Sequence, residues 1–165
     1  MQKIGLLSDT HSYLDPQLKE FFAPCDEIWH AGDVGSIEVI NQLEQWKPLR
    51  CVYGNIDDHK LRAEFPEIQF FYCEKVKVLM IHIGGKPKAY RASALAAIGE
   101  FRPQLFICGH SHILKVEYDK EYEMLFVNPG ASGKHGFHHV RTAVRFTIEN
   151  ENIKDFEIIE LGVRG

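Results

Sequence analysis

The sequence predicts an α/β protein in which two packed sheets, partly parallel and partly antiparallel, carry helices on their outer faces. Strands and helices alternate through the first half of the chain, whereas hairpin-like pairs of strands dominate the second half. No linker or low-complexity segment divides the 165 residues, so we expect a single domain over 1–165.

The first half contains three apolar strands separated by two helices. The strands are predicted at Lys3–Ser8, Glu27–Ala31 and Leu49–Tyr53. The helix Asp15–Phe22 opens with an N-cap residue followed by proline, and the helix Ser36–Trp46 carries an apolar stripe. Strands that alternate with helices favour parallel pairing through right-handed crossovers.

The second half contains one helix, predicted at Arg91–Phe101, and a larger number of strands. These strands are predicted at Ile68–Cys73, Val76–Ile83, Gln104–Cys108, Leu114–Tyr118, Tyr122–Val127, Ala143–Glu149 and Ile153–Ile159. Short polar turns join consecutive strands around Glu74–Lys75, Asp119–Glu121 and Asn150–Asn152. Such turns between apolar runs are typical of antiparallel pairs.

Composition and charge exclude several classes of protein. The net charge of −4 provides no basic field for long nucleic acids, which we do not expect as partners. No apolar run approaches the ~18 residues of a membrane span, and the first apolar stretch is too short for a signal peptide. We therefore expect a cytoplasmic protein without membrane contact. The four cysteines form no C-x-x-C pair, which indicates buried, reduced thiols.

Polar side chains follow five of the predicted strands at the point where each strand ends. Because the carboxyl ends of parallel strands meet in one crevice, we expect these side chains to lie together. Carboxylate oxygen and neutral imidazole nitrogen suit manganese, iron, zinc or nickel, and a cation relieves the cost of burying such groups unpaired. The candidate metal ligands are Asp9, His11, Asp33, Asn55, His82, His110 and His112.

This set of ligands exceeds what one four-coordinate ion needs, but it suffices for two ions if one carboxylate bridges them. Two ions about 3.5–4 Å apart are the arrangement that enzymes use for in-line displacement at phosphorus. Two dications balanced by two carboxylates and one hydroxide leave a net positive site that attracts phosphate. Gly32, Gly54 and Gly109 each precede a ligand, where a sharp turn with positive φ is expected.

The ordered series of motifs resembles the calcineurin-like metallophosphoesterases, in particular their small, single-domain bacterial and archaeal members. The matching segments are Asp9–His11, Gly32–Asp33, Gly54–Asp57, His82, Gly109–His112 and Asn128–Gly130. The resemblance implies a four-layer α/β/β/α sandwich and a dinuclear metal site. It also implies two ligand sets that share Asp33, namely Asp9, His11, Asp33 and His112 for one ion, and Asp33, Asn55, His82 and His110 for the other.

The function implied by this resemblance is metal-dependent hydrolysis of a phosphodiester or phosphomonoester, with a metal-bridging hydroxide as nucleophile and a small phosphorylated substrate. Asp33, Asn55 and His82 would serve catalysis by positioning metal and phosphate. We favour Mn²⁺ over iron, zinc or nickel. Two positions depart from the wider family. Ile56 stands where many members have a histidine thought to protonate the leaving group, and Gly84 replaces a second histidine, so poor leaving groups should react slowly.

Several further residues have two interpretations. Arg91 and Lys134 are candidates for phosphate contacts, since cationic side chains bind phosphate oxygens, and His135 is a third substrate-binding candidate. The segments 84–91 and 133–141, which contain these residues, either form a rim that contacts the substrate or are polar loops without a role in binding. His30 and Asp57 are expected to support the site through hydrogen bonds.

An alternative function is a catalytically weak or inactive metal-binding scaffold of the same fold that acts through protein contacts. A eukaryotic trafficking subunit that resembles this fold has lost part of the metal set and works in that way. The present chain keeps every ligand position, which favours the enzyme. Exposed strand edges leave a homo-oligomer possible, and the sequence does not decide the oligomeric state.

Overall fold

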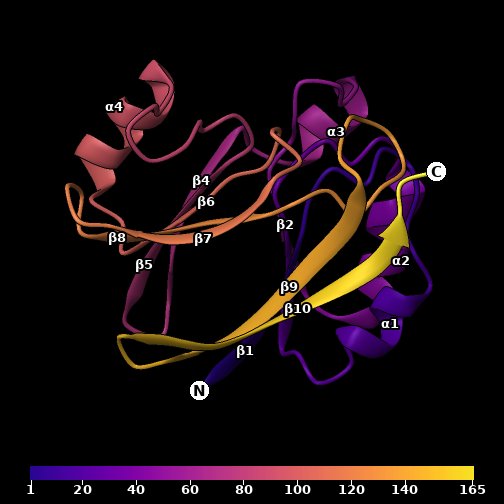
Figure 1. The fold of residues 1–165 in the computed structure, drawn as a ribbon, viewed down its shortest axis with the longest axis horizontal. Coiled ribbons are helices and arrows are strands. Elements are labelled where there is room, and N and C mark those ends of the chain that lie inside the picture. The colour runs from indigo at the N-terminus through magenta and orange to yellow at the C-terminus, as the bar shows by residue number, and fades with distance from the viewer.

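The computed structural model describes residues 1–165 as two five-stranded sheets that face one another, with four helices outside them (Figure 1). The first sheet has the strand order β10-β9-β1-β2-β3. Its strands are β1 (Gln2–Leu7), β2 (Glu27–His30), β3 (Leu49–Cys51), β9 (Val140–Glu149) and β10 (Asn152–Val163). Strands β1, β2 and β3 are parallel, as the alternation with helices predicts, and β9 pairs antiparallel with both β1 and β10.

The second sheet has the order β4-β5-β6-β8-β7 and is also mixed. Its strands are β4 (Ile68–Cys73), β5 (Val76–Ile81), β6 (Leu105–Ile107), β7 (Leu114–Asp119) and β8 (Met124–Pro129). Strands β5, β6 and β8 are parallel, while the two edge strands β4 and β7 are antiparallel to their neighbours.

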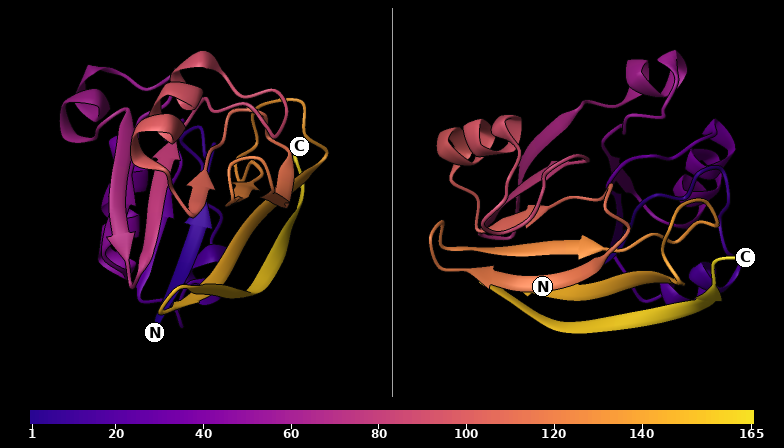
Figure 2. Two further views of the ribbon diagram at one scale, coloured as in Figure 1. Left: turned by 90° about the vertical axis from the view of Figure 1, so that its left-hand side faces the viewer. Right: turned by 45° about the horizontal axis from the view of Figure 1, so that its top comes forward.

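Three of the helices complete the four-layer sandwich. Helices α1 (Gln17–Phe21) and α2 (Ile37–Trp46) lie against the outer face of the first sheet, and α4 (Ala92–Phe101) covers the outer face of the second (Figures 1 and 2). Helix α3 (His59–Glu64) was not predicted from the sequence. It buries only Leu61 and therefore has no apolar stripe. Its one local signal is Asp58, whose carboxylate accepts hydrogen bonds from the backbone N–H groups of the first turn.

Alternation along the strands assigns each apolar side chain to one of three cores. Ile4 and Leu6 of β1 point into the core between the two sheets, whereas Leu7 packs in the core under α1 and α2. Likewise, Met80 of β5 faces the central core and Leu79 faces the core under α4. Successive side chains on a strand point to opposite faces, so a strand that is buried on both faces has an unbroken apolar sequence.

The C-terminal hairpin is longer than predicted. Strand β9 begins at Val140, inside the segment expected to be a loop, and β10 continues to Val163. Register shifts between Lys154 and Glu157 and between Glu160 and Gly162 break the alternation of β10, which hides its length in the sequence.

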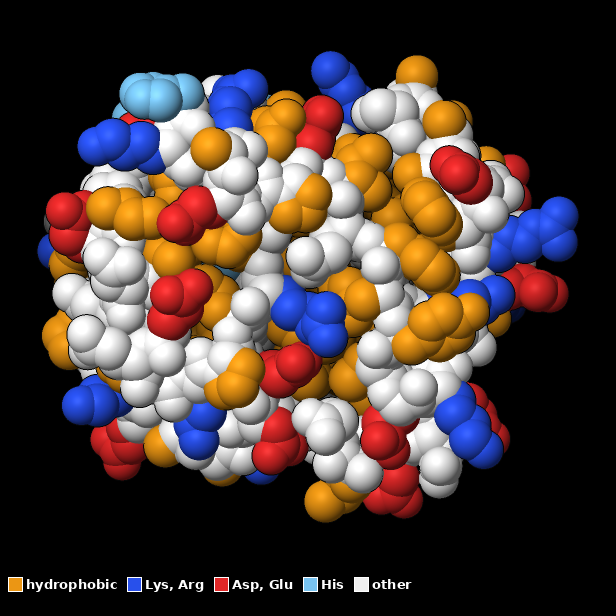
Figure 3. All heavy atoms as spheres, turned by 180° about the vertical axis from the view of Figure 1, so that it is seen from behind, with side chains coloured by type: hydrophobic (Ala, Val, Ile, Leu, Met, Phe, Trp, Pro, Cys, Tyr) orange, Lys and Arg blue, Asp and Glu red, His pale blue; other side chains and the backbone are white.

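All four cysteines are free and buried, as predicted, and burial raises the pKa of the Cys108 thiol to about 12. None of the four helices has the length and apolar character that a membrane crossing requires. On the face shown in Figure 3, acidic and basic side chains are interspersed, so this face presents no electrostatic field of one sign.

Candidate metal centre

The parallel strands of both sheets point toward the same edge of the molecule, and the candidate ligands follow their carboxyl ends (Figure 2). Asp9 and His11 lie beyond β1, and Asp33 lies beyond β2. His82 comes directly after β5, while the loop after β6 supplies both His110 and His112. The fold thus brings together side chains that are up to about a hundred residues apart in the chain, because crossover connections return each strand to the same edge.

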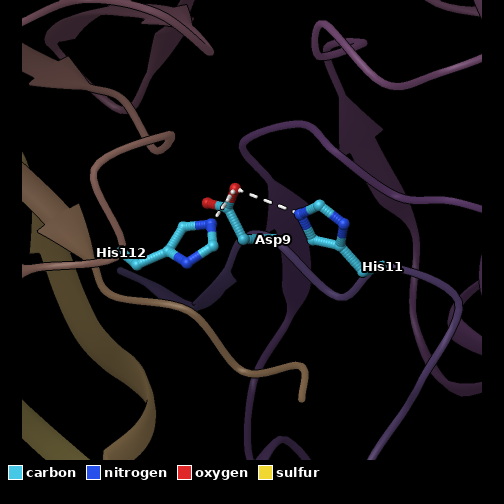
Figure 4. A group of neighbouring side chains, drawn as sticks. All are labelled: Asp9, His11 and His112. Atoms are coloured by element: carbon cyan, nitrogen blue, oxygen red, sulfur yellow. Dashed lines mark hydrogen bonds and ion pairs between the residues drawn. The ribbon is translucent and has the colours of Figure 1, made fainter. Parts of the chain in front are cut away.

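The first group of potential metal ligands is formed by Asp9, His11 and His112 (Figure 4). Its ligand atoms all lie within 4.8 Å of one another. The Asp9 Oδ1 atom is 3.1 Å from His112 Nε2 and 3.9 Å from His11 Nε2. The other carboxylate oxygen of Asp9 accepts hydrogen bonds from the Ser8 hydroxyl and from the backbone N–H of His110. Asp9 is therefore fixed from one side and open to a cation on the other.

The second group is formed by Asp33, His82 and His110, and Asp33 also faces the first group. Its Oδ1 atom is 3.3 Å from His82 Nε2, and its Oδ2 atom is 3.4 Å from His11 Nε2. The two carboxylate oxygens of Asp33 thus face two different groups. Asn55 lines the cavity that contains Asp33, His11 and His110, so the fold places it beside both groups.

Three of the imidazoles, those of His82, His112 and His138, have a tautomer that the surrounding hydrogen bonds determine. His82 Nδ1 lies 2.7 Å from the carbonyl oxygen of Ala31, so this nitrogen donates. His138 Nε2 lies 2.8 Å from the carbonyl oxygen of Gly133, which leaves its Nδ1 to accept from His112 Nδ1 at 3.1 Å. In neutral His82 and His112, the Nε2 lone pair therefore faces a carboxylate.

This arrangement fits divalent metal ions. The Nε2 atoms of His11 and His82 are buried and make no hydrogen bond, although carboxylate oxygens lie within 4 Å of both. Lone pairs that face carboxylates at such distances repel unless a proton or a metal ion lies between them. Imidazole nitrogen and carboxylate oxygen form the donor set that manganese, iron, zinc and nickel accept.

The electrostatics of the centre favour bound cations. Burial raises the pKa of the Asp33 carboxyl, but His11 and His82 outweigh burial and hold this pKa well below its usual range. The same balance, with His112 and His82 as the opposing groups, lowers the pKa of Asp9. For His82, burial lowers the imidazole pKa, and the facing carboxylates more than compensate, so the pKa is raised. Both carboxylates are thus ionised at neutral pH and attract positive charge.

The turns out of the strands are made by the ligand residues themselves. Asp9, His11, Asp33, His110 and His112 all have positive φ, for example 56° at Asp33 and 64° at His112. A non-glycine residue in this region costs about 1 kcal/mol or more, and such residues concentrate at functional sites. The left-handed turns are therefore strained features that the packing around the centre holds in place.

The expectation of positive φ at three glycines is correct only for Gly32, whose φ is 100°. At Gly54 a side chain would collide with the Asp33 carboxylate, and at Gly109 it would collide with the Ser8 hydroxyl. These two glycines are therefore required by close approach to the site and not by backbone conformation.

His30 and Asp57 support the site as predicted. Burial lowers the pKa of His30 to about 4, and its neutral ring accepts from the Gly32 N–H and contacts the Thr10 hydroxyl at 3.0 Å. The buried carboxylate of Asp57 accepts from the N–H groups of Val34, Gly35 and Gly54, and so joins the loop after β2 to the loop after β3.

Asn128 supports the loop after β6. Its side-chain amide donates to the Gly109 carbonyl oxygen and to the Ser111 hydroxyl, both at 3.0 Å. Its side-chain oxygen accepts from the Gly130 N–H, which shapes the turn after β8. The loop that carries two candidate ligands is therefore held by an amide from the neighbouring strand.

The histidine-containing segment 133–141 has several distinct roles. His135 stacks on His11 at 4.7 Å between ring centroids and lines the cavity of about 400 Å³ over the site. Lys134 places its ammonium over the ring of Tyr13 and is not among the residues that line this cavity. The interpretation of this segment as wholly a rim or loop is wrong at Arg141, which is buried in β9 and pairs with Asp15 at 2.7 Å.

His138 has a role that the sequence did not reveal. Its ring accepts from His112 and orients a candidate ligand, as described above. Only the clustering of histidines in the segment pointed toward it, because the contact with His112 exists only in the folded chain.

The two groups at the carboxyl edge of an α/β/β/α sandwich define a protein with two adjoining potential metal sites. The sequence of residues 2–151 matches the family model of the calcineurin-like phosphoesterase superfamily domain, and the chain belongs to this family. A probable metallophosphoesterase of Methanothermobacter thermautotrophicus is 33% identical over 135 residues, which span 78% of this chain and 76% of the relative. A probable metallophosphoesterase of Methanocaldococcus jannaschii is 28% identical over 134 residues, spanning 78% of this chain and 67% of the relative.

Solved structures share the fold at lower identity. A structurally and functionally characterised archaeal phosphodiesterase superposes with a TM-score of 0.76 at 23% identity, covering 96% of this chain and 99% of that one. Vps29 of Entamoeba histolytica, in complex with zinc, superposes with a TM-score of 0.73 at 16% identity, covering 97% and 99% of the two chains. These likenesses establish the two-sheet fold.

Proposed function

We propose that the protein hydrolyses a phosphodiester or phosphomonoester bond of a small substrate with the help of two divalent metal ions. The observation that carries this proposal is the position of Asp33, whose two carboxylate oxygens face two different groups of ligands. One ion would be held by Asp9, His11, Asp33 and His112, and the other by Asp33, Asn55, His82 and His110.

When bound, two such ions polarise phosphoryl oxygens and acidify a water molecule, so that the nucleophile is available near neutral pH. The role of the chain is to hold the ligand atoms still. The hydrogen bonds from His82 to Ala31 and from His112 to His138 direct the Nε2 lone pairs inward. The backbone N–H of Ile56 donates to Asp33 at 3.1 Å and restrains the proposed bridging carboxylate.

The chain provides no obvious acid at the position beside Asn55. Ile56 is 45% exposed and lines the cavity over the site, so an aliphatic surface occupies this part of the wall. We infer that the enzyme favours substrates with good leaving groups, since general acid catalysis contributes about 10²–10⁴-fold where it operates.

The preferred cofactor in this proposal is Mn²⁺, since a mixed carboxylate, amide and imidazole set suits it. Availability and geometry also decide metal choice, and iron, zinc or nickel would satisfy the same donors. We place the protein in the cytoplasm, where its four unpaired thiols stay reduced. The net charge of −4 and the mixed surface of Figure 3 favour a small substrate over long nucleic acid.

The second candidate function is a scaffold that acts through protein contacts, and the fold shared with Vps29 is the observation in its favour. It predicts no need for two stoichiometric metal ions. The six carboxylate and imidazole ligands gathered in two groups favour the enzyme.

The test combines turnover with metal content. Purified protein is assayed with Mn²⁺ against p-nitrophenyl phosphate and bis(p-nitrophenyl) phosphate, and bound metal is counted by elemental analysis. We expect two ions per chain and metal-dependent turnover, both lost in Asp33→Ala. His139→Ala is the matched control, since this exposed histidine belongs to neither group and should leave both readouts intact. Wild-type turnover no greater than that of Asp33→Ala would refute the enzyme, and metal-free protein would favour the scaffold.

A further inference from the structure

A second cavity, of about 390 Å³, opens beside the metal centre on the side of His110. One wall is the segment that leads into α4, which includes Lys86 and Arg91. The loop after β6 forms the wall that the cavity shares with the metal centre. The two sites are therefore contiguous, and the volume lies within the ~300–1,000 Å³ typical of small-molecule sites.

The charges that line this cavity are all of one sign. Lys86, Arg91 and Lys115 contribute three cations, and no carboxylate is among the lining residues. Lys115 has only a long contact of 3.8 Å with the exposed Glu117, and the other two side chains have no acidic partner. This distribution is unusual in a chain with a net charge of −4, and it selects for an anion.

Part of the lining of the cavity is apolar. Ile83, the largely exposed Ile113 and the buried ring of Phe126 line the same cavity as the three cations. An inorganic anion alone would leave this surface without a partner. An organic group that carries an anion would cover the apolar part of the lining and contact the cations at the same time.

The cationic wall is anchored in the fold. Tyr90 packs its ring against Phe106 and Phe126, and its hydroxyl donates to Asp119 at 2.6 Å. The backbone N–H of Arg91 donates to the carbonyl oxygen of Gly84 at 3.0 Å. The backbone that presents Lys86 and Arg91 is thereby held before any ligand binds, which lowers the entropic cost of binding.

We propose that this cavity binds the part of the substrate beyond the scissile bond, and that this part is a partly apolar group bearing a second phosphate. The proposal rests on the proposed phosphoesterase function, because the cavity adjoins the metal centre through His110. A second phosphate fits better than a carboxylate, since three cations that line one cavity match its higher charge and its three terminal oxygens.

Three synthetic substrates with one hydrolysable bond each test this assignment. They are 4-(phosphonomethyl)phenyl phosphate, 4-(carboxymethyl)phenyl phosphate and the neutral-tailed 4-ethylphenyl phosphate. We expect kcat/KM for the phosphonate to exceed that for the ethyl compound by about 10-fold or more, as charge-assisted contacts provide. Equal values for these two compounds would overturn the proposal. A carboxylate that equals the phosphonate would overturn the choice of phosphate.

Variants assign the preference to the cavity. In Lys86→Gln/Arg91→Gln, the ratio of kcat/KM for the phosphonate to that for the ethyl compound should fall toward unity. Lys88→Gln is the matched control, because this exposed lysine of the same segment does not line the cavity. It should keep the wild-type ratio. An unchanged ratio in the double variant would refute the role of these cations.

A binding measurement separates this proposal from the phosphoesterase function. Benzylphosphonate is titrated by calorimetry into wild-type and variant protein in the presence of EDTA. Saturable binding that weakens about 10-fold or more in Lys86→Gln/Arg91→Gln, but not in Lys88→Gln, supports the cavity even if no substrate is hydrolysed. Absence of binding to the wild type would overturn the cavity proposal and leave the phosphoesterase proposal standing on its own assay.

Discussion

Replacement of Asp57 by asparagine should destabilise the protein by about 3.5–5 kcal/mol, although the two side chains have almost the same volume and shape. One carboxylate oxygen accepts from Gly54 at 2.7 Å and from Val34 at 3.2 Å, and the other accepts from Gly35 at 2.9 Å. The side chain is buried, so water cannot replace these bonds.

The magnitude follows from the number and kind of the bonds. An asparagine oxygen can keep the bonds from Gly54 and Val34, but its amide nitrogen then faces the N–H of Gly35. One charge-assisted bond, worth about 1.5–3 kcal/mol, is lost, and two others weaken by about 1 kcal/mol each as they become neutral. Because no cavity is created, the whole effect is attributable to hydrogen bonding.

The assay is urea unfolding in EDTA, followed by the fluorescence of Trp29 and Trp46, with the midpoint and slope fitted together. Asp58→Asn is the matched control. Asp58 caps α3 through two bonds of 3.1 Å, and asparagine is an equally good N-cap, so its variant should lose less than about 0.5 kcal/mol. A loss below about 1 kcal/mol in Asp57→Asn would refute the reasoning.

Three further predictions concern other parts of the molecule. Asp15→Ala should cost about 3–5 kcal/mol in urea unfolding, because it leaves the buried Arg141 guanidinium unpaired. Burial raises the pKa of Asp15, but Arg141 outweighs burial and lowers this pKa below 3.8. The stabilisation by the pair is therefore complete above pH 3.8 and is lost as the pH falls through the folded-state pKa. If Asp15→Ala unfolded with the same dependence on acid pH as the wild type, this explanation would be contradicted. His138→Ala should weaken Mn²⁺ binding about 10–100-fold by calorimetry with an unchanged circular dichroism spectrum, and undiminished affinity would exclude its orienting role. Mn²⁺ at about 100 times its Kd should stabilise wild-type protein by about 2.7 kcal/mol in thermal unfolding, and an equal gain in Asp33→Ala would place the metal elsewhere.

The parts of the fold that the sequence predicts are those encoded by local periodicity. Parallel β1, β2 and β3 follow from apolar runs alternating with helices, and the structure confirms their pairing. Helix α3 was missed because one buried residue, Leu61, leaves no repeating pattern. The end of β10 was missed because two bulges interrupt the period on which strand prediction depends.

The sequence predicts which residues of the candidate site lie close together, but it does not predict the contacts that hold them in place. Strand ends bring Asp9, Asp33 and His112 together, because parallel strands share one carboxyl edge. The pairing of Arg141 with Asp15 joins residues 126 positions apart, so a charge that looks solvent-exposed in the sequence is buried. The contact between His138 and His112 also depends on tertiary structure, and no spacing rule anticipates it.

The loop after β6 gives one ligand candidate to each group, His110 to the second and His112 to the first. Asn128 fastens this loop to β8 through Gly109 and Ser111. Because one fastened loop carries both side chains, any displacement of it would move His110 and His112 together. We therefore expect a change that loosens this loop to weaken both metal positions and not one of them alone.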